Sequence, residues 1–222
     1  MTSTPVTVEA RAILFDMDGT LVDSTPVVEG MWGEFAARHD VDLAELLAFS
    51  HGRQTHHTMA RFLPSGADGV AALAAFQAGE LERTDGIQEI PGAGRLLAQL
   101  DGARVAMVTS APRDLAMLRM AAAGLTVPEI LICEENTPAG KPDPSGYLAA
   151  AEQLGVAAAD CVILEDAEAG IQAALASGGR PLVVGAHASA TTGSLLRVPD
   201  LSVITATVLD DGGVRLTWQP TD

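Results

Sequence analysis

Residues 11–20, RAILFDMDGT, decide the fold: an apolar run is followed directly by acidic and other polar residues. The apolar run 11–15 is typical of a parallel strand that is covered on both faces of its sheet. It is followed at once by the pair Asp16 and Asp18, and then by Gly19. In an open α/β sheet, ligands bind beyond the carboxyl ends of the strands. Two carboxylates at such an end therefore suit a metal ion and an anion together.

Four more apolar runs predict strands of the same sheet, and amphipathic stretches between them predict helices. The strands are expected at 104–109, 129–133, 161–165 and 181–185. The helices are expected at 93–100, 113–123, 144–154 and 168–177. This alternation of strand and helix predicts a doubly wound parallel sheet of the α/β class.

The segment from Asp23 to about Pro91 breaks this rhythm, because it contains no convincing strand pattern. Thr25 can cap a helix with Pro26 at its first position, and further helices are expected at 42–49, 54–63 and 69–83. We therefore predict a helical cap domain at 23–91, inserted into a discontinuous core domain formed by 1–22 and 92–222.

The last residues again favour strands. LSVIT (201–205) has the pattern of a strand, and TATVLDDGGVRLTW (205–218) has that of a β-hairpin with Asp-Gly-Gly at its turn. The hairpin either extends the core sheet or forms a dimer edge. The pattern leaves open whether the protein is a monomer or a homodimer.

The composition narrows the range of partners. Hydrophobic residues make up 48% of the 222 residues and charged residues 19%, which is ample for a packed core. The 13 Lys and Arg stand against 29 Asp and Glu, a formal net charge of −16, which disfavours nucleic acid and anionic membranes as partners. No signal peptide or membrane-spanning pattern is evident, so we expect a cytoplasmic protein.

Polar residues also follow the later strands, and each has an ordinary structural interpretation as well as a functional one. Thr109 and Ser110 can bind an anion or merely begin a helix. Lys141, the one lysine of the sequence, can neutralise Asp16 and a bound phosphoryl group, or be an ordinary surface lysine. Glu165 and Asp166 can join Asp16 around a cation, or simply favour a helix dipole. Because oxygen ligands beside a phosphate suit Mg²⁺, the combination predicts a magnesium site.

Four motifs, FDMDGTLVDS, VTSA, GKPDP and EDAEAG, resemble in order those of the haloacid dehalogenase superfamily. The resemblance covers nearly the whole chain and favours the branch that contains β-phosphoglucomutase and the small sugar phosphatases. It implies a Rossmann-like core with strand order 5-4-1-2-3 and a helical cap inserted after the first motif.

Roles carried over from the resemblance make Asp16 the nucleophile and Asp18 the general acid and base. They imply Mg²⁺ held by Asp16, the backbone carbonyl of Asp18 and Asp166, with Glu165 contacting the metal directly or through water. The phosphate binders are then Thr109, Ser110 and Lys141.

The segment SHGRQTHHTMARFLP (50–64) is similar to the cap segment of bacterial hexose and hexitol phosphate phosphatases. It is also similar to that of yeast glycerol-3-phosphate and 2-deoxyglucose-6-phosphate phosphatases. The resemblance implies that His51, Gly52, Arg53 and Thr55 contact the far end of a small phosphorylated metabolite. We therefore expect a phosphatase that acts on a sugar or polyol phosphate.

Two alternatives stay open. β-Phosphoglucomutase carries Lys before this glycine and Arg three residues after it, where this chain has His51 and Thr55, so a mutase is disfavoured. A non-catalytic protein that binds a phosphorylated metabolite is the second alternative, and the intact motifs disfavour it.

Overall fold

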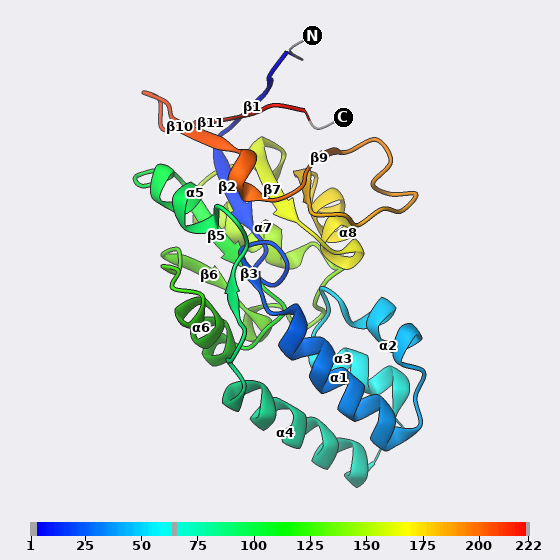
Figure 1. Ribbon diagram of the computed structural model, residues 1–222. Helices are drawn as coiled ribbons and strands as arrows, with labels where there is room; N and C mark the ends of the chain where they lie inside the picture. Colours follow the sequence, from blue (N-terminus) through cyan, green and yellow to red (C-terminus); the bar gives the residue numbers. More distant parts are fainter. Residues whose placement is uncertain (1–3, 64–65, 221–222) are drawn as a thin grey trace.

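A parallel sheet of six strands forms the centre of the computed structural model (Figure 1). The structure describes residues 4–63 and 66–220; Pro64, the last residue of the segment 50–64, lies outside it. Every pair of neighbouring strands runs parallel. Across the sheet the strands are β6 (Ile130–Ile132), β5 (Val105–Val108), β2 (Ala12–Phe15), β7 (Cys161–Glu165), β8 (Arg180–Val184) and β9 (Leu196–Val198).

The strand order 5-4-1-2-3 is confirmed for the five expected strands, which appear as β8-β7-β2-β5-β6. The sixth strand, β9, was not expected, because its sequence is only Leu-Arg-Val and its leucine is 47% exposed. It pairs with β8, and Arg197 adds a hydrogen bond to the carbonyl oxygen of Gly185 at 2.8 Å. A contact of this kind, from one arginine side chain to a backbone carbonyl, leaves no periodic pattern in the sequence.

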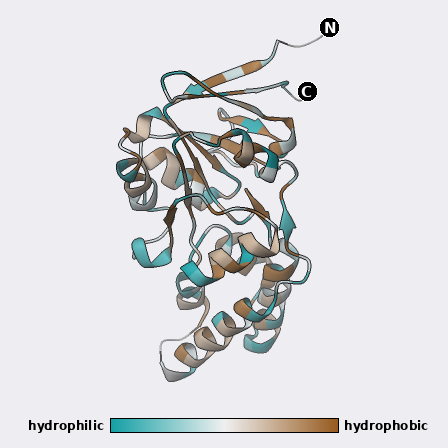
Figure 2. Ribbon diagram, turned by 90° about the vertical axis from the view of Figure 1, so that its left-hand side faces the viewer, coloured by the Kyte–Doolittle hydropathy of each residue, from teal (hydrophilic) through white to brown (hydrophobic). Residues whose placement is uncertain are grey.

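The two faces of the sheet are covered by different helices. Ile13 and Phe15 of β2 pack with α5 (Ala93–Gln99) and α6 (Arg113–Ala122), whereas Ala12 and Leu14 pack with α7 (Ser145–Gln153) and α8 (Glu168–Ala176). Successive side chains of β2 point to opposite faces of the sheet and thus belong to two separate apolar clusters. Figure 2 shows the resulting hydrophobic strands running through the interior of the upper part. The four predicted helices are confirmed to within one residue at each end.

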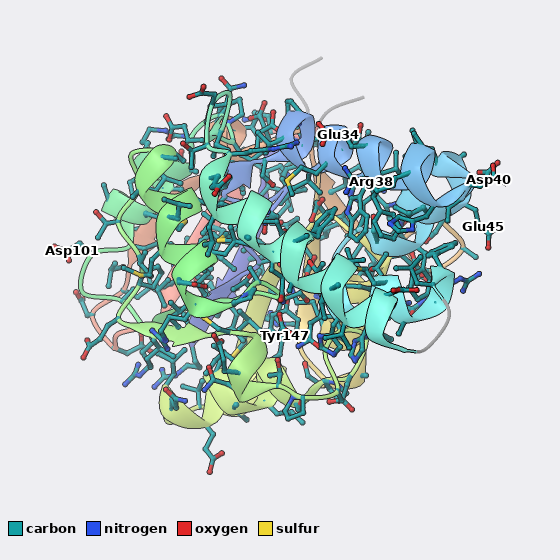
Figure 3. All side chains as sticks on the ribbon, turned by 90° about the horizontal axis from the view of Figure 1, so that it is seen from below. Glu34, Arg38, Asp40, Glu45, Asp101 and Tyr147 are labelled. Carbon is teal, nitrogen blue, oxygen red and sulfur yellow. The ribbon has the colours of Figure 1, made fainter. Side chains whose placement is uncertain are left out.

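The segment predicted to be helical forms four helices at the carboxyl ends of the strands (Figure 1). They are α1 (Thr25–His39), α2 (Leu43–Ser50), α3 (Thr55–Phe62) and α4 (Ala67–Glu82). They surround an apolar cluster of their own, in which the rings of Trp32 and Phe76 have centroids 4.2 Å apart. Acidic side chains at the outer end, including Asp40 and Glu45, extend away from this cluster (Figure 3).

The expectation that 23–91 contains no strand is wrong at its borders. β3 (Val22–Asp23) pairs antiparallel with β4 (Gln88–Glu89). Two residues are too few to show a period of two, so this pairing is invisible as a pattern. The pair joins the segment that leads into the four helices to the segment that leads out of them.

The terminal residues form a second, three-stranded antiparallel sheet rather than an extension of the core sheet. The predicted hairpin is confirmed as β10 (Thr205–Val208) and β11 (Val214–Trp218), and β11 also pairs with the unexpected strand β1 (Val6–Ala10). The predicted strand 201–205 is wrong, because Leu201–Val203 form a 3-10 helix. Asp200 causes this turn, since its carboxylate accepts from the backbone N–H of Ser202 at 2.8 Å.

Three short 3-10 helices complete the described elements, at Glu134–Asn136, Ala158–Asp160 and Leu201–Val203. Across residues 4–63 and 66–220, none of the helices has the length and apolar character needed to cross a membrane. The carboxyl ends of β2, β5, β6 and β7 meet at one edge, directly facing α1 to α4 (Figure 1).

Candidate active site

Four neighbouring strands bring the predicted polar residues to one place. Asp16 follows β2, Thr109 follows β5, Lys141 lies in the loop after β6, and Glu165 ends β7. Because the strands are parallel, their carboxyl ends lie side by side. All the expected core site residues therefore meet at the same edge, although the chain separates them by up to 150 residues (166 − 16).

Lys141 is the centre of a buried ionic cluster. Its Nζ lies 2.5 Å from Asp16 Oδ1 and 2.7 Å from Glu165 Oε1, and it donates to the carbonyl oxygen of Val108 at 3.1 Å. The Lys141 side chain is only 6% exposed. The neighbouring carboxylates raise the pKa of Lys141 although burial opposes this, so the amine is held as a cation between two acids.

Tyr147, on α7, supports the cluster from below and lies toward the middle of Figure 3. Its hydroxyl donates to Glu165 Oε1 at 2.5 Å, while the backbone N–H of Asp166 donates to Glu165 Oε2 at 3.2 Å. The two oxygens of the fully buried Glu165 are therefore both engaged by groups of the protein. Sequence reasoning did not single out Tyr147.

Asp16, Glu165 and Asp166 form an acidic group that one cation can bridge. Each offers a carboxylate oxygen, and these oxygens all lie within 4.8 Å of one another. Burial and the charge of Glu165 raise the pKa of Asp16 to about 7, against the opposing effect of Lys141. Burial likewise raises the pKa of Asp166 well above its usual range, and Asp166 Oδ1 is buried with no hydrogen-bond partner among the described residues. An unpaired buried oxygen beside two further acids fits a divalent cation with oxygen ligands.

Gly19 leaves room for the Asp166 carboxylate. Its φ is +86°, and a Cβ atom there would lie 2.0 Å from Asp166 Oδ2. We expect Gly19→Ala to be more destabilising than Gly102→Ala, because Gly102 has a similar φ of +78° but nothing within 4 Å of its Cβ position. The control should cost about 1–2 kcal/mol of backbone strain. Urea unfolding of both variants measures the difference, and equal losses would contradict the crowding at Gly19.

The side chain of Asp18 has its hydrogen-bond partners outside this acidic group. Its Oδ1 accepts from the Ser24 hydroxyl at 2.6 Å, and its Oδ2 accepts from Arg119 at 2.9 Å. The Asp18 side chain is 30% exposed, and it lines a pocket together with Asp16. Two carboxylates that are adjacent in the motif thus have different surroundings.

Of the two expected hydroxyls beyond β5, only one faces the core. Thr109 is buried, and its Oγ1 accepts from the backbone N–H of Ala111 at 3.1 Å. Ser110 instead donates its hydroxyl to the carbonyl oxygen of Gly52 at 2.8 Å. Its side chain therefore joins the sheet edge to the loop between α2 and α3.

One pocket joins the sheet edge to the four helices, with about 90 Å³ open to water. His51, Gly52, Arg53 and Thr55 all line it, so the structure brings the four expected residues of the helical segment to the same space as Asp16. Lys141 and Glu165 are absent from this lining and lie behind Asp16. By contrast His56 contacts Glu134 at 2.8 Å, a contact between the helical segment and the loop after β6.

Arg119 and Glu80 also line the pocket, and sequence reasoning missed both. A signal existed for Arg119, because it lies on the buried stripe of α6 with Leu115, Ala116 and Met120, where a charge is unusual. Glu80 carries no such signal, since acidic residues are common on helix surfaces.

Comparisons with known proteins place the chain in a family. A family model described as haloacid dehalogenase-like hydrolase matches residues 10–178. Hexitol phosphatase A of Escherichia coli K12 is 41% identical over 182 residues, covering 80% of this chain and 84% of that protein. Glycerol-1-phosphate phosphohydrolase 1 of Saccharomyces cerevisiae is 31% identical over 191 residues, covering 80% and 76%. A crystal structure of a hydrolase from Pseudomonas syringae has the same fold, with a TM-score of 0.76, 23% identity and coverage of 86% and 94%.

Proposed function

This chain belongs to the haloacid dehalogenase-like hydrolases and is a phosphoric monoester hydrolase, and from that premise we propose how it acts and on what. We propose that it hydrolyses a small sugar or polyol phosphate through an aspartyl-phosphate on Asp16. The observation that carries the proposal is the meeting of Asp16, Lys141 and Asp166 beside a pocket that also contains Asp18.

In the proposed first step, a carboxylate oxygen of Asp16 attacks phosphorus, and the bond from phosphorus to the alcohol oxygen breaks. Asp18, in its protonated form, gives its proton to the departing oxygen. Lys141 stays beside Asp16 and offsets the negative charge that gathers on the phosphoryl group. Thr109 and Ser110, which directly follow the neighbouring strand β5, are the proposed partners of the phosphoryl oxygens.

In the second step, a water molecule attacks the phosphorus of the aspartyl-phosphate. Asp18 is now a carboxylate and takes the proton from that water, so that it returns to its starting form. The carboxylate of Asp16 and inorganic phosphate are the products. One aspartate thus serves as nucleophile and the other as acid and then as base.

The acidic group also supports a proposed Mg²⁺ site. Asp16, Asp166 and the backbone carbonyl of Asp18 would hold the ion, with Glu165 supporting it. Mg²⁺ supplies positive charge that polarises the phosphoryl group. The support for the site is the unpartnered Asp166 Oδ1 and the raised pKa of both aspartates, which a nearby cation relieves.

We propose that residues 23–91 act as a cap domain over a core formed by 1–22 and 92–222. In this proposal His51, Gly52, Arg53 and Thr55 contact the sugar or polyol end of the substrate. Their common position around the pocket supports this, as do the relatives that are named for hexitol and glycerol-1-phosphate.

A screen of phosphate release over hexose, pentose, hexitol and glycerol phosphates tests the proposal. We expect steady release with at least one of them in Mg²⁺ and loss of that release in EDTA, because the acidic group then loses its cation. Adding Mg²⁺ back should restore the rate, which separates loss of metal from loss of fold.

The same screen decides between the alternatives. Conversion of β-glucose 1-phosphate to glucose 6-phosphate without net phosphate release would favour a mutase. Binding of a phosphorylated metabolite in calorimetry, with no turnover of any substrate, would favour a non-catalytic role and would reject the phosphatase proposal.

A further inference from the structure

A buried ion pair links α6 to α4 beside the pocket. Arg119 donates to Glu80 Oε1 at 3.1 Å, and each of the two side chains is only 6% exposed. Removing two charges from water is costly, and such a pair is rarely a net source of stability. Its position at the site therefore suggests a role other than holding the fold together.

The second arm of the guanidinium reaches Asp18. Arg119 donates to Asp18 Oδ2 at 2.9 Å, while Ser24 donates to Asp18 Oδ1 at 2.6 Å. In the ionised form both oxygens of Asp18 thus have a donor, and its rotation is fixed from two sides. In the protonated form the proton lies on Oδ1, because the guanidinium at Oδ2 can only donate whereas the Ser24 hydroxyl can also accept. Because a guanidinium is planar and rigid, the direction of one arm sets the direction of the other.

The other oxygen of Glu80 contacts a second residue of the helical segment, Thr55. The Thr55 hydroxyl donates to Glu80 Oε2 at 3.4 Å, and Glu80 lies near the end of α4, which packs against α6. A chain of contacts therefore runs from Thr55 and Glu80 through Arg119 to Asp18. Its first two members belong to the segment 23–91, and its last two belong to the part that carries the sheet.

We infer that Arg119 is a positioning residue for Asp18, and that Glu80 keeps Arg119 aimed at it. The inference rests on the proposed function, in which Asp18 protonates the departing oxygen. Asp18 is then correctly oriented only while α4 lies on α6. The helical segment would thus take part in the chemistry without touching the reacting atoms.

This role has a consequence that depends on the leaving group. A nitrophenolate departs readily without a proton, whereas an alkoxide needs one. Misplacing Asp18 should therefore slow the cleavage of benzyl phosphate far more than that of p-nitrophenyl phosphate. Neither compound has hydroxyl groups for the pocket to recognise, so recognition of a sugar does not enter the comparison.

The experiment measures kcat/KM for both substrates in the wild type and in Arg119→Met, Arg119→Lys and Glu80→Gln. kcat/KM reports the first irreversible step and is independent of the later hydrolysis of the aspartyl-phosphate. For Arg119→Met we expect the ratio of benzyl to p-nitrophenyl activity to fall by about 10²-fold, the lower end of the usual contribution of a placed acid, because Asp18 itself is still present. Glu80→Gln should show a smaller fall in the same direction. Lysine should rescue only part, because one ammonium cannot reach both partners.

Two matched controls should leave the ratio unchanged. Glu82→Gln changes an exposed residue on the same helix as Glu80. Arg113→Met changes an arginine of α6 whose guanidinium contacts Leu131 rather than the pocket. An equal fall with both substrates would indicate a structural role and overturn the inference. A rise in KM at constant kcat would indicate a substrate contact and would also overturn it. If Arg119→Met does not fold, the same ratio is measured in Glu80→Gln and in the double variant Arg119→Met/Glu80→Gln, in which neither member of the pair is charged. A selective fall with benzyl phosphate in these variants supports the inference, and an equal fall with both substrates overturns it. A wild type that cleaves neither compound nor any metabolite rejects the proposed function instead.

Discussion

Asp16→Asn is expected to lower phosphate release by about 10⁴-fold or more, which is the scale of losing a nucleophile. The neutral amide oxygen cannot attack phosphorus in place of a carboxylate. The fold should remain, because asparagine has nearly the same shape and Lys141 keeps its contact with Glu165 at 2.7 Å. Burial already raises the pKa of Asp16 to about 7, so removing this charge relieves part of an electrostatic cost.

The measurement is single-turnover and steady-state phosphate release on the best substrate of the screen. Asp101→Asn is a suitable control, since Asp101 is an exposed aspartate at the far edge of the molecule (Figure 3). Trapping of phosphoprotein in the wild type and its absence in Asp16→Asn would link the loss to the intermediate. A variant as active as the wild type would reject the aspartyl-phosphate mechanism.

Lys141→Met is expected to damage both activity and stability. Asp16 and Glu165 would be left as buried acids without their cation, which typically costs about 3–5 kcal/mol in the free energy of unfolding. Phosphate release should fall by at least about 10²-fold, because the charge that offsets the phosphoryl group is gone.

Urea unfolding with and without Mg²⁺ separates the two effects. We expect Mg²⁺ to recover part of the lost stability, because a bound cation replaces some of the missing positive charge, while activity stays low. Arg83→Met removes a cation from an exposed pair with Glu34 and should change neither property much. If Lys141→Met were as stable as the wild type, Asp16 and Glu165 would not depend on Lys141 to offset their buried charge.

The core of the fold was predictable because its signals are local. Each central strand is a short apolar run buried on both faces, as in Cys161–Glu165, and each helix between strands has its own stripe. The order of the strands came from the resemblance rather than from periodicity. The meeting of Asp16 and Asp166 then follows from parallel topology, since each lies directly after a strand, whereas Lys141 reaches them from the loop that follows β6.

What escaped prediction depends on contacts between distant residues. β1 pairs Val6 with Trp218, and a five-residue terminal run gives no hint of a partner at the other end of the chain. The apolar pattern of 201–205 suggested a strand, but a single carboxylate at Asp200 turned it into a 3-10 helix. Arg119 was missed for a related reason, because its two carboxylate partners lie 39 and 101 residues away.

The burial of Lys141 also gives the surface an unusual chemistry. It is the sole lysine among the 13 basic side chains, so every other fixed cation of the chain is a guanidinium. An acylating reagent that targets amines therefore finds no exposed lysine on the folded protein, and the one it can reach on unfolding is the partner of Asp16. The rate at which this lysine is acylated therefore measures how often the buried cluster around Asp16 opens to solvent.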